Sequence, residues 1–250
     1  MSDAPTGKLA LVTGSSRGIG RATALALADM GYDQVVNYFR NEEAAKKTAD
    51  DLRAKGVRAE IFRANVGEEA ELNALFDFVA ETFGYLDVLV NNAISAVFAP
   101  LMKHPVEGFE ETFRVNVRSA FIATQRAQKL FRKKKQGCIV NVLSVGSMRY
   151  IPAYTALGVS KAALEALTKY SAHELGKFGT RVNAVSGGLI DTESVAAMGP
   201  KIRAQAVERT PMGREGRAED MADVIAFLCS EKARWINGQT VIADGGYTFS

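Results

Sequence analysis

The sequence is poor in several features that would each point to a particular class of protein. It has two cysteines in 250 residues, Cys138 and Cys229, in no CxxC pair, which argues against a disulfide framework or a zinc cluster. No apolar run reaches the ~18 residues of a membrane-spanning helix. Residues 1–6 are too short and polar for a signal peptide. We therefore expect a cytoplasmic protein with buried free thiols and no membrane partner.

An excess of charge of one sign is also missing. The 31 Lys and Arg residues against 28 Asp and Glu leave a net charge of +3, which is too weak to indicate nucleic-acid binding. The two histidines, His104 and His173, share no ligand spacing with each other or with the cysteines, so we predict no metal site. The hydrophobic fraction of 47% and the charged fraction of 24% are typical of a globular protein and not of a disordered one.

Short apolar runs alternate with longer helical patterns along the chain. We expect strands at 8–12, 34–37, 58–63, 86–90, 138–143, 181–185 and 240–242, and helices at 21–30, 42–55, 68–83, 107–131, 155–175 and 219–230. This alternation predicts an α/β protein with one Rossmann-type domain over 1–250, a doubly wound parallel sheet with helices on both faces. The stretch 194–216, which is rich in glycine and proline, predicts a mobile insertion that covers the substrate.

A glycine-rich loop stands between the first expected strand and the first expected helix. It reads Thr13-Gly14-Ser15-Ser16-Arg17-Gly18-Ile19-Gly20. Glycines let the backbone turn tightly and approach a pyrophosphate, which rests on the N-terminus of the following helix. Glycine clusters alone are weak evidence, but this position makes a nucleotide site the better interpretation. The predicted contacts are Gly14, Ser16, Arg17, Gly18, Ile19 and Gly20.

The residues after the second expected strand indicate which nicotinamide cofactor is bound. Enzymes that use NAD usually carry an acidic residue there for the ribose hydroxyls, and this chain has none before Arg40. Arg17 and Arg40 can bracket a 2′-phosphate, so the sequence predicts NADPH. Taken singly, each of these arginines would more often be a solvated surface residue.

Further motifs, in order along the chain, resemble the short-chain dehydrogenase/reductase family. Besides the glycine loop, the matching residues are Asn91-Asn92-Ala93, Asn116, Ser144, Lys161, Gly187-Gly188 with Thr192, and Asp244-Gly245-Gly246. The resemblance implies a nicotinamide cofactor, a seven-stranded sheet and a homotetramer. It also implies cofactor contacts from Asn65, Val66, Asn92, Ala93, Lys161, Gly188, Ile190 and Thr192.

One departure from the family concerns the catalytic tyrosine. Ordinary members carry Tyr-x-x-x-Lys, but here the residue four before Lys161 is Leu157, and the nearest tyrosine is Tyr154. Offsets of four and seven return to about the same helix face, displaced by about one turn at ~1.5 Å per residue, if the helix extends back to Tyr154. Because Tyr154 comes two residues after Pro152, it could instead lie just before the helix. In enoyl-thioester reduction the negative charge appears on an oxygen remote from the hydride acceptor, so a hydroxyl set back from the nicotinamide would suit that reaction.

The longer spacing, together with the segment 144–161, resembles the NADPH-dependent third isoform of bacterial enoyl-[acyl-carrier-protein] reductases. The resemblance implies reduction of the trans-2 double bond of an enoyl chain on acyl-carrier protein, during fatty-acid elongation. Tyr154 would stabilise the enolate and Lys161 would hold the nicotinamide ribose, with Ser144 and Asn116 completing the catalytic set. The basic run Arg132, Lys133, Lys134 and Lys135 is either a solvated face or a docking patch for the acidic carrier, to which Lys201, Arg203, Arg209 and Arg214 could contribute.

Two other functions remain open from the residues alone. The chain could be a carbonyl reductase for ketoacyl, sugar or steroid substrates, using Ser144 and a displaced tyrosine, although Leu157 speaks against this. It could also be an inactive NADPH sensor or scaffold, although Lys161 and Asn116 speak against that. Tyr150 is a rival hydroxyl in the loop before the helix.

Overall fold

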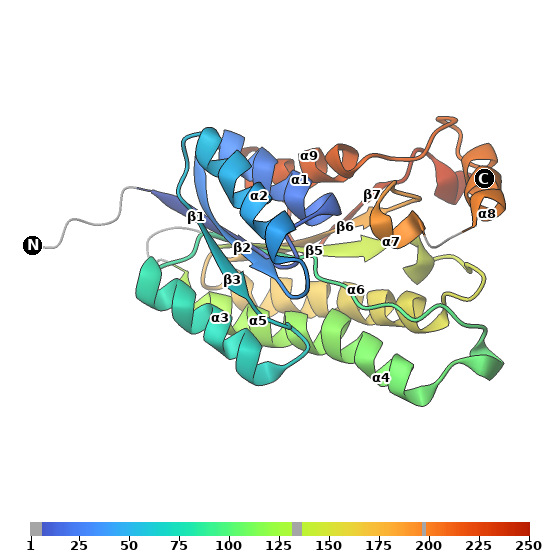
Figure 1. The fold of residues 1–250 in the computed structure, drawn as a ribbon, viewed down its shortest axis with the longest axis horizontal. Coiled ribbons are helices and arrows are strands. Elements are labelled where there is room, and N and C mark those ends of the chain that lie inside the picture. Colours follow the sequence, from blue (N-terminus) through green and yellow to red (C-terminus); the bar gives the residue numbers. More distant parts are fainter. Residues whose placement is uncertain (1–6, 132–136, 197–198) are drawn as a thin grey trace, which may run out of the picture.

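The computed structural model describes residues 7–131, 137–196 and 199–250, which form one seven-stranded sheet with helices on both faces (Figure 1). The strands are β1 (Lys8–Val12), β2 (Tyr32–Tyr38), β3 (Ala59–Arg63), β4 (Val88–Asn91), β5 (Cys138–Ser144), β6 (Arg181–Gly187) and β7 (Thr240–Ala243). The helices are α1 (Gly18–Asp29), α2 (Glu42–Ala54), α3 (Glu69–Thr82), α4 (Val106–Phe113), α5 (Ser119–Leu130), α6 (Thr155–Gly176), α7 (Glu193–Ala196), α8 (Pro200–Glu208) and α9 (Ala218–Cys229).

The sheet has the order β3-β2-β1-β4-β5-β6-β7, and every neighbouring pair is parallel. Helices α1, α2 and α9 cover one face, whereas α3, α4, α5 and α6 cover the other (Figure 1). The predicted doubly wound fold with seven parallel strands is therefore confirmed.

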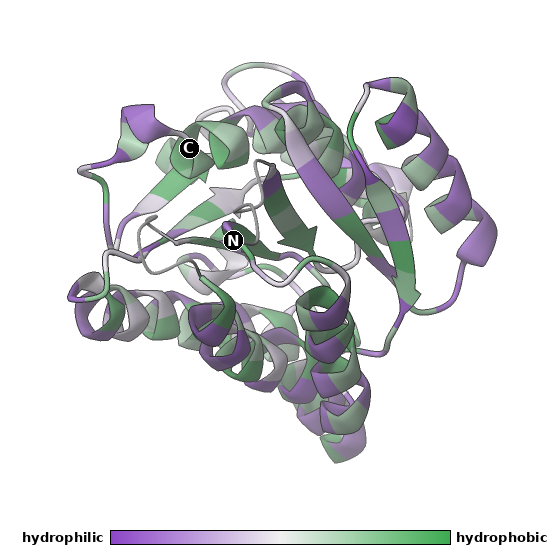
Figure 2. Cartoon of the chain, turned by 90° about the vertical axis from the view of Figure 1, so that its left-hand side faces the viewer, coloured by the Kyte–Doolittle hydropathy of each residue, from purple (hydrophilic) through white to green (hydrophobic). Residues whose placement is uncertain are grey.

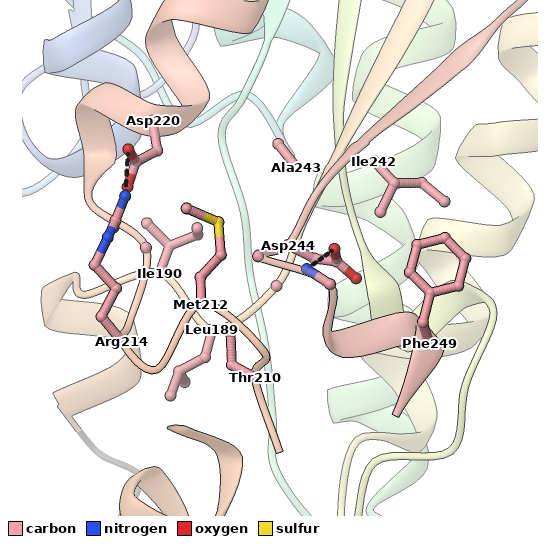
Figure 3. Close-up of a pocket in the computed structure, with 14 residues that line it drawn as sticks. Leu189, Ile190, Thr210, Met212, Arg214, Asp220, Ile242, Ala243, Asp244 and Phe249 are labelled. Carbon is pink, nitrogen blue, oxygen red and sulfur yellow. Dashed lines mark hydrogen bonds and ion pairs between the residues drawn. The ribbon is translucent and has the colours of Figure 1, made fainter. Parts of the chain in front are cut away.

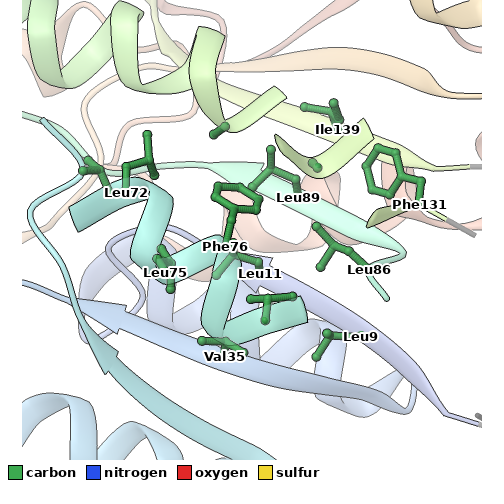
Figure 4. Packing of buried hydrophobic residues seen from close by; sticks show 14 of the residues in the cluster. Leu9, Leu11, Val35, Leu72, Leu75, Phe76, Leu86, Leu89, Phe131 and Ile139 are labelled. Atoms are coloured by element: carbon green, nitrogen blue, oxygen red, sulfur yellow. The ribbon is translucent and has the colours of Figure 1, made fainter. Parts of the chain in front are cut away.

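Residues on the two faces of the strands alternate between two cores. Leu9, Leu11 and Leu89 point into the core beneath α3 and α5, where Phe76 is completely buried (Figure 4). Val12 and Val90 point into the opposite core, beneath α1 and α9. Because both faces are covered, the central strands β1 and β4 are apolar almost throughout. Figure 2 shows green strands at the centre of the sheet, between helices that carry both hydrophobic and hydrophilic residues.

The strand order determines where a ligand can bind. Strand β1 lies between β2 and β4, so the chain turns to opposite sides of the sheet after β1 and after β4. In such sheets, ligands bind beyond the carboxyl ends of the strands at this switch point. The glycine loop follows β1, Asn92 follows β4, and Ser144 ends β5, so they meet at one edge.

The long helix expected over 107–131 is interrupted by a π-helical turn. It consists of α4, the π turn Arg114–Arg118 and α5, with Asn116 inside the turn. One residue added to a helical turn leaves the hydrophobic pattern nearly unchanged, which is why periodicity does not reveal it. Such turns are frequent at functional sites.

The stretch 194–216, expected to be an insertion, contains most of α7 and the whole of α8. Within the described part of the chain, no helix is both long enough and apolar enough to cross a bilayer.

Candidate active site

The glycine loop has a backbone shape that other residues would disturb. Gly14 and Gly18 have φ of +65° and +55°, in the left-handed region. A Cβ on Gly20 would lie 2.4 Å from the Gly14 carbonyl oxygen. At the first turn of α1, no side chain caps the helix and no acidic residue is present. The uncapped N-terminus of α1 and the close backbone approach that the loop allows therefore fit the pyrophosphate of a dinucleotide.

The loop after β4 is fastened to the glycine loop. The hydroxyl oxygen of Thr13 accepts hydrogen bonds from the backbone N–H groups of Asn92 and Ala93, each at 3.0 Å. The side-chain amide of Asn92 donates to the carbonyl oxygens of Thr13 at 2.8 Å and Gly14 at 3.2 Å. The predicted residues Asn92 and Ala93 thus lie beside the glycine loop. Thr13 was not among the predicted site residues, although a hydroxyl directly after β1 was a visible signal.

Asn37, also not predicted, joins the glycine loop to β2. Its side-chain oxygen accepts from the Gly14 N–H at 3.0 Å, and its carbonyl oxygen accepts from the Ser15 N–H at 3.0 Å. The carbonyl of the predicted Ser16 accepts from the Thr48 hydroxyl at 3.0 Å. Ile19 packs its side chain into the core below. The loop is therefore rigidly positioned over the end of β2, where the adenosine half of a dinucleotide lies in this fold.

The two arginines predicted to bracket a 2′-phosphate have different partners in this structure. Arg17 forms an ion pair with Glu193 at the start of α7. Arg40 is exposed and stands over the ring of Phe39, with 5.7 Å between its guanidinium carbon and the ring centroid. Among the described residues, Arg40 has no acidic partner. Arg40 is thus available to an anion, whereas Arg17 is already engaged.

The remaining predicted cofactor residues lie along the same edge of the sheet. At the end of β3, the Asn65 side-chain oxygen accepts from the Gly67 N–H at 3.0 Å, and Val66 is buried. Beyond β6, Ile190 is buried, and a Cβ on Gly18 would lie 3.6 Å from Thr192 Cγ2, so Thr192 faces the glycine loop. Gly188 continues β6, its N–H donating to the carbonyl oxygen of Ala243.

Ser144 and Tyr154 meet at the carboxyl end of β5. The Tyr154 hydroxyl donates to Ser144 Oγ at 3.0 Å. The tyrosine ring lies so close to Gly146 that a Cβ there would be 2.5 Å from Tyr154 Cε1. Phe98 covers the ring from the loop after β4, with 5.7 Å between the ring centroids. The ring is therefore held on both sides with its hydroxyl directed at the serine.

The local backbone explains how a tyrosine at the longer spacing reaches this serine. Helix α6 begins at Thr155, so Tyr154 is its N-cap and not part of the helical face. Ala153 has φ of +59°, the one positive φ at a non-glycine position among the described residues. The setback by a helical turn was expected only if the helix extended back to Tyr154, and that condition is not met. Leu157, at the family's usual tyrosine position, is buried with 2% exposure.

Lys161 is buried on α6 with its amine directed at the sheet. Its Nζ donates to the carbonyl oxygen of Val142 at 2.6 Å. Burial lowers the pKa of Lys161 to about 8. Burial also raises the pKa of Tyr154, against the opposing effect of its hydrogen bond with Ser144. The Tyr154 phenol thus stays protonated at neutral pH, whereas the Lys161 amine can lose its charge just above neutral pH.

Asn116 connects the π turn to the helix that carries Lys161. Its side-chain oxygen accepts from the Ser95 N–H at 2.9 Å, and its amide nitrogen donates to the Ser95 carbonyl and to Ser160 Oγ, next to Lys161. Asn116 is thus buried, and both ends of its side-chain amide are hydrogen-bonded. Its membership of the catalytic set remains a prediction.

A cavity of about 540 Å³ opens beyond the ends of β6 and β7 (Figure 3). Its apolar lining comes from Leu189, Ile190, Met212, Ile242 and Phe249. Gly187 at the end of β6 pairs in register with Ser144, so the cavity begins one strand away from the serine. An apolar chain attached near Ser144 would find space here.

Several basic residues considered for carrier docking are engaged with other groups. Arg203 pairs with Asp191 at 2.7 Å and also with Glu215, and Arg214 pairs with Asp220 at 2.6 Å. Arg209 stands over the ring of Tyr247. The run Arg132, Lys133, Lys134 and Lys135 lies outside the described residues.

Comparisons with known proteins agree on the family. The sequence profile of a family described as enoyl-(acyl carrier protein) reductase matches residues 14–248. The chain is 37% identical to the 3-oxoacyl-[acyl-carrier-protein] reductase FabG of Staphylococcus aureus (strain Mu50), over 96% of this chain and 97% of that protein. It is 39% identical to the 1-cyclohexenylcarbonyl-CoA reductase of Streptomyces collinus, over 96% and 86% respectively. Angucycline C-6 ketoreductase LanV with bound NADP superposes with a TM-score of 0.91 at 34% identity, over 97% and 96%.

The chain therefore belongs to the short-chain dehydrogenase/reductase family. The NADP bound to LanV agrees with the predicted NADPH.

The same comparisons correct the predicted reaction. Reduction of the double bond of an enoyl chain, and with it the assignment as an enoyl-[acyl-carrier-protein] reductase acting on a CH–CH bond, is wrong. Relatives that match nearly the whole chain are named as a 3-oxoacyl reductase and a ketoreductase, which act on carbonyl groups. The name of the family profile does not decide between enoyl reduction and carbonyl reduction, because this chain also matches the 3-oxoacyl reductase and the ketoreductase. The structure supplies a physical reason, since the Tyr154 hydroxyl reaches Ser144 instead of standing one turn back.

Proposed function

We propose that this chain is an NADPH-dependent carbonyl reductase that converts the 3-oxo group of an acyl thioester to a hydroxyl. The observation that carries this proposal is the 3.0 Å contact between Tyr154 Oη and Ser144 Oγ, two hydroxyls that can hold one carbonyl oxygen. The names of the two curated relatives support a thioester substrate, carried by acyl-carrier protein in one and by CoA in the other. We propose acyl-carrier protein as the partner that presents the substrate.

The two hydroxyls supply what carbonyl reduction needs from the protein. Ser144 donates a hydrogen bond to the substrate oxygen, and Tyr154 turns its O–H from Ser144 to the same oxygen. When bound, NADPH would supply the hydride that the carbonyl carbon receives. The Tyr154 proton passes to the oxygen as negative charge develops there, which yields the hydroxyl, and solvent returns a proton to the phenolate. A donor aimed at developing charge acts mainly in the transition state.

Residues around this pair provide the remaining functions. The charged amine of Lys161, buried nearby on α6, favours transfer of the phenolic proton and holds the ribose hydroxyls of the cofactor. The cavity lined by Leu189, Met212 and Phe249 accommodates the acyl chain. We propose that the segment around 194–216 covers this chain, because Thr210 and Met212 form one wall of the cavity.

The pKa of Lys161 predicts how the reaction depends on pH. Because burial lowers this pKa to about 8, the amine loses its charge as pH rises through that value. We expect kcat to be level below about 8 and to fall above it, since the raised pKa of Tyr154 keeps the phenol protonated there. Initial rates with saturating substrates across this range measure the profile. Lys161→Arg should move the fall in kcat to higher pH. A fall in kcat at the same pH in this variant would assign the titration to another group.

The reaction itself is tested by substrate choice. Purified protein and NADPH are mixed with acetoacetyl-CoA or with crotonyl-CoA, and the loss of NADPH absorbance is followed. We expect oxidation of NADPH with the keto compound, and mass spectrometry should show the hydroxyacyl thioester as product. The same two acyl groups on acyl-carrier protein then compare the carriers. Consumption of NADPH with crotonyl-CoA alone would overturn the proposal, and consumption with neither would indicate a protein that binds the cofactor without this chemistry.

A further inference from the structure

A second arginine stands beside Arg40 at the carboxyl edge of the sheet. Arg63 is the last residue of β3, and the strand register places it opposite Tyr38, two residues before Arg40. Its guanidinium carbon lies 5.2 Å from the centroid of the Phe39 ring, compared with 5.7 Å for Arg40. Both guanidinium groups therefore contact the same ring, and contact with an aromatic ring holds a guanidinium in place without removing its charge.

Neither of these arginines is neutralised by an acidic side chain among the described residues, whereas several arginines nearby are. Arg21 pairs with Asp51 at 2.6 Å, and Arg53 pairs with Asp50 at 2.9 Å. Glu42, two residues after Arg40, forms an ion pair with Lys46. Two positive charges on one aromatic ring without acidic partners repel each other, so a bound anion that reached both would stabilise both.

The position of the pair identifies the anion. Asn37 binds the glycine loop through its side chain and its carbonyl oxygen, and Phe39 and Arg40 follow two and three residues later. A dinucleotide whose pyrophosphate rests on that loop places its adenosine ribose over the end of β2. The group that distinguishes NADPH there is a 2′-phosphate, an oxyanion that arginine binds with paired hydrogen bonds.

We propose that Arg63 is a specificity-determining residue that binds the adenosine 2′-phosphate together with Arg40, with the Phe39 ring as their common support. This inference rests on the NADPH preference of the proposed function. It adds Arg63 to the bracket of Arg17 and Arg40 predicted from the sequence, in which Arg17 forms an exposed ion pair with Glu193 in this structure. Arg63 ends β3 and Arg40 lies two residues beyond the end of β2, so these adjacent parallel strands bring both residues to the same edge of the sheet.

The test measures binding of cofactor fragments, without any turnover. Isothermal titration of the wild-type protein and of Arg63→Ala is carried out with 2′,5′-ADP and with 5′-AMP, which differ only in the 2′-phosphate. A lost charge-assisted contact of about 1.5–3 kcal/mol corresponds to roughly tenfold to hundredfold weaker binding. We expect that loss for 2′,5′-ADP and for NADP⁺, with the affinities for 5′-AMP and NAD⁺ unchanged. Arg40→Ala should show the same selectivity, and the difference should shrink in high salt.

Arg58→Ala is a matched control, because Arg58 lies just before β3 at its opposite end and also stands over a phenylalanine ring, that of Phe83, at 4.3 Å. It should leave all four affinities unchanged. Equal weakening of both fragments by Arg63→Ala would assign Arg63 to the adenine or to the local fold, and no change would remove it from the site. Either result overturns the inference. The outcome does not depend on which bond of a thioester is reduced, so the proposed reaction can fail without affecting it.

Discussion

Tyr154→Phe is expected to lower kcat for a 3-oxoacyl thioester by on the order of 100-fold or more, the usual cost of removing one oriented donor to developing charge. The change deletes the hydroxyl that lies 3.0 Å from Ser144 Oγ and keeps the ring packed between Gly146 and Phe98. The affinity for NADPH should stay unchanged, because the glycine loop is held by hydrogen bonds with Asn37, Thr48 and Asn92 and the substitution leaves these in place. Steady-state rates and cofactor titration measure the two quantities.

Tyr150→Phe is the control for this experiment. Tyr150 is 86% exposed in the loop before α6, so losing its hydroxyl should leave kcat unchanged. A Tyr154→Phe protein with nearly full activity would show that another group protonates the product. If Tyr150→Phe instead lost the activity, the exposed loop would have to fold over the substrate during turnover.

Gly20→Ala is expected to weaken NADPH binding by about tenfold or more, because it forces atoms into space that the loop needs. The new methyl group would lie 2.4 Å from the Gly14 carbonyl oxygen and 2.5 Å from Asn92 Nδ2. Relieving such overpacking typically costs about 1–3 kcal/mol, and about 1.4 kcal/mol already corresponds to a tenfold change in affinity. The backbone must move where the pyrophosphate approaches. Cofactor titration and a thermal melt should show a higher Kd and a lower Tm.

Gly176→Ala provides the comparison, since Gly176 ends α6 and an added Cβ would meet only Asn237 Nδ2, at an ordinary distance of 3.7 Å. That variant should keep the wild-type Kd. Wild-type affinity in Gly20→Ala would mean that the loop can shift without cost, and the close-approach argument for this glycine would fail.

The fold could be predicted from the sequence because its signals are local. The run Lys8–Val12 is apolar and short, it precedes a glycine loop, and it forms β1 with the expected bounds. Strands buried on both faces are apolar throughout, so each one stands out between helical patterns. The π turn at Arg114–Arg118 could not be predicted in this way, because it adds one residue to a helix whose hydrophobic face continues. The homotetramer and the cytoplasmic location remain predictions.

The site was predictable in position but not in geometry. Residues at the carboxyl ends of parallel strands meet at one edge, and Ser144 and the glycine loop lie at that edge in the structure. The ion pair of Arg17 with Glu193 joins residues far apart in the sequence, and no local pattern reports it. The direction of the Tyr154 hydroxyl depends on where α6 begins, and helix ends are less certain than helices themselves. The roles of these residues in binding and catalysis remain predictions until the variants are measured.

Ala153 introduces a conflict between stability and function at this position. With φ of +59°, it holds a backbone shape that costs an alanine about 1 kcal/mol and a glycine almost nothing. A glycine there would relieve the strain in the folded state, but it would also loosen the turn that delivers the following tyrosine to its serine. Selection for higher stability and selection for a well-oriented Tyr154 hydroxyl would thus favour different residues at position 153.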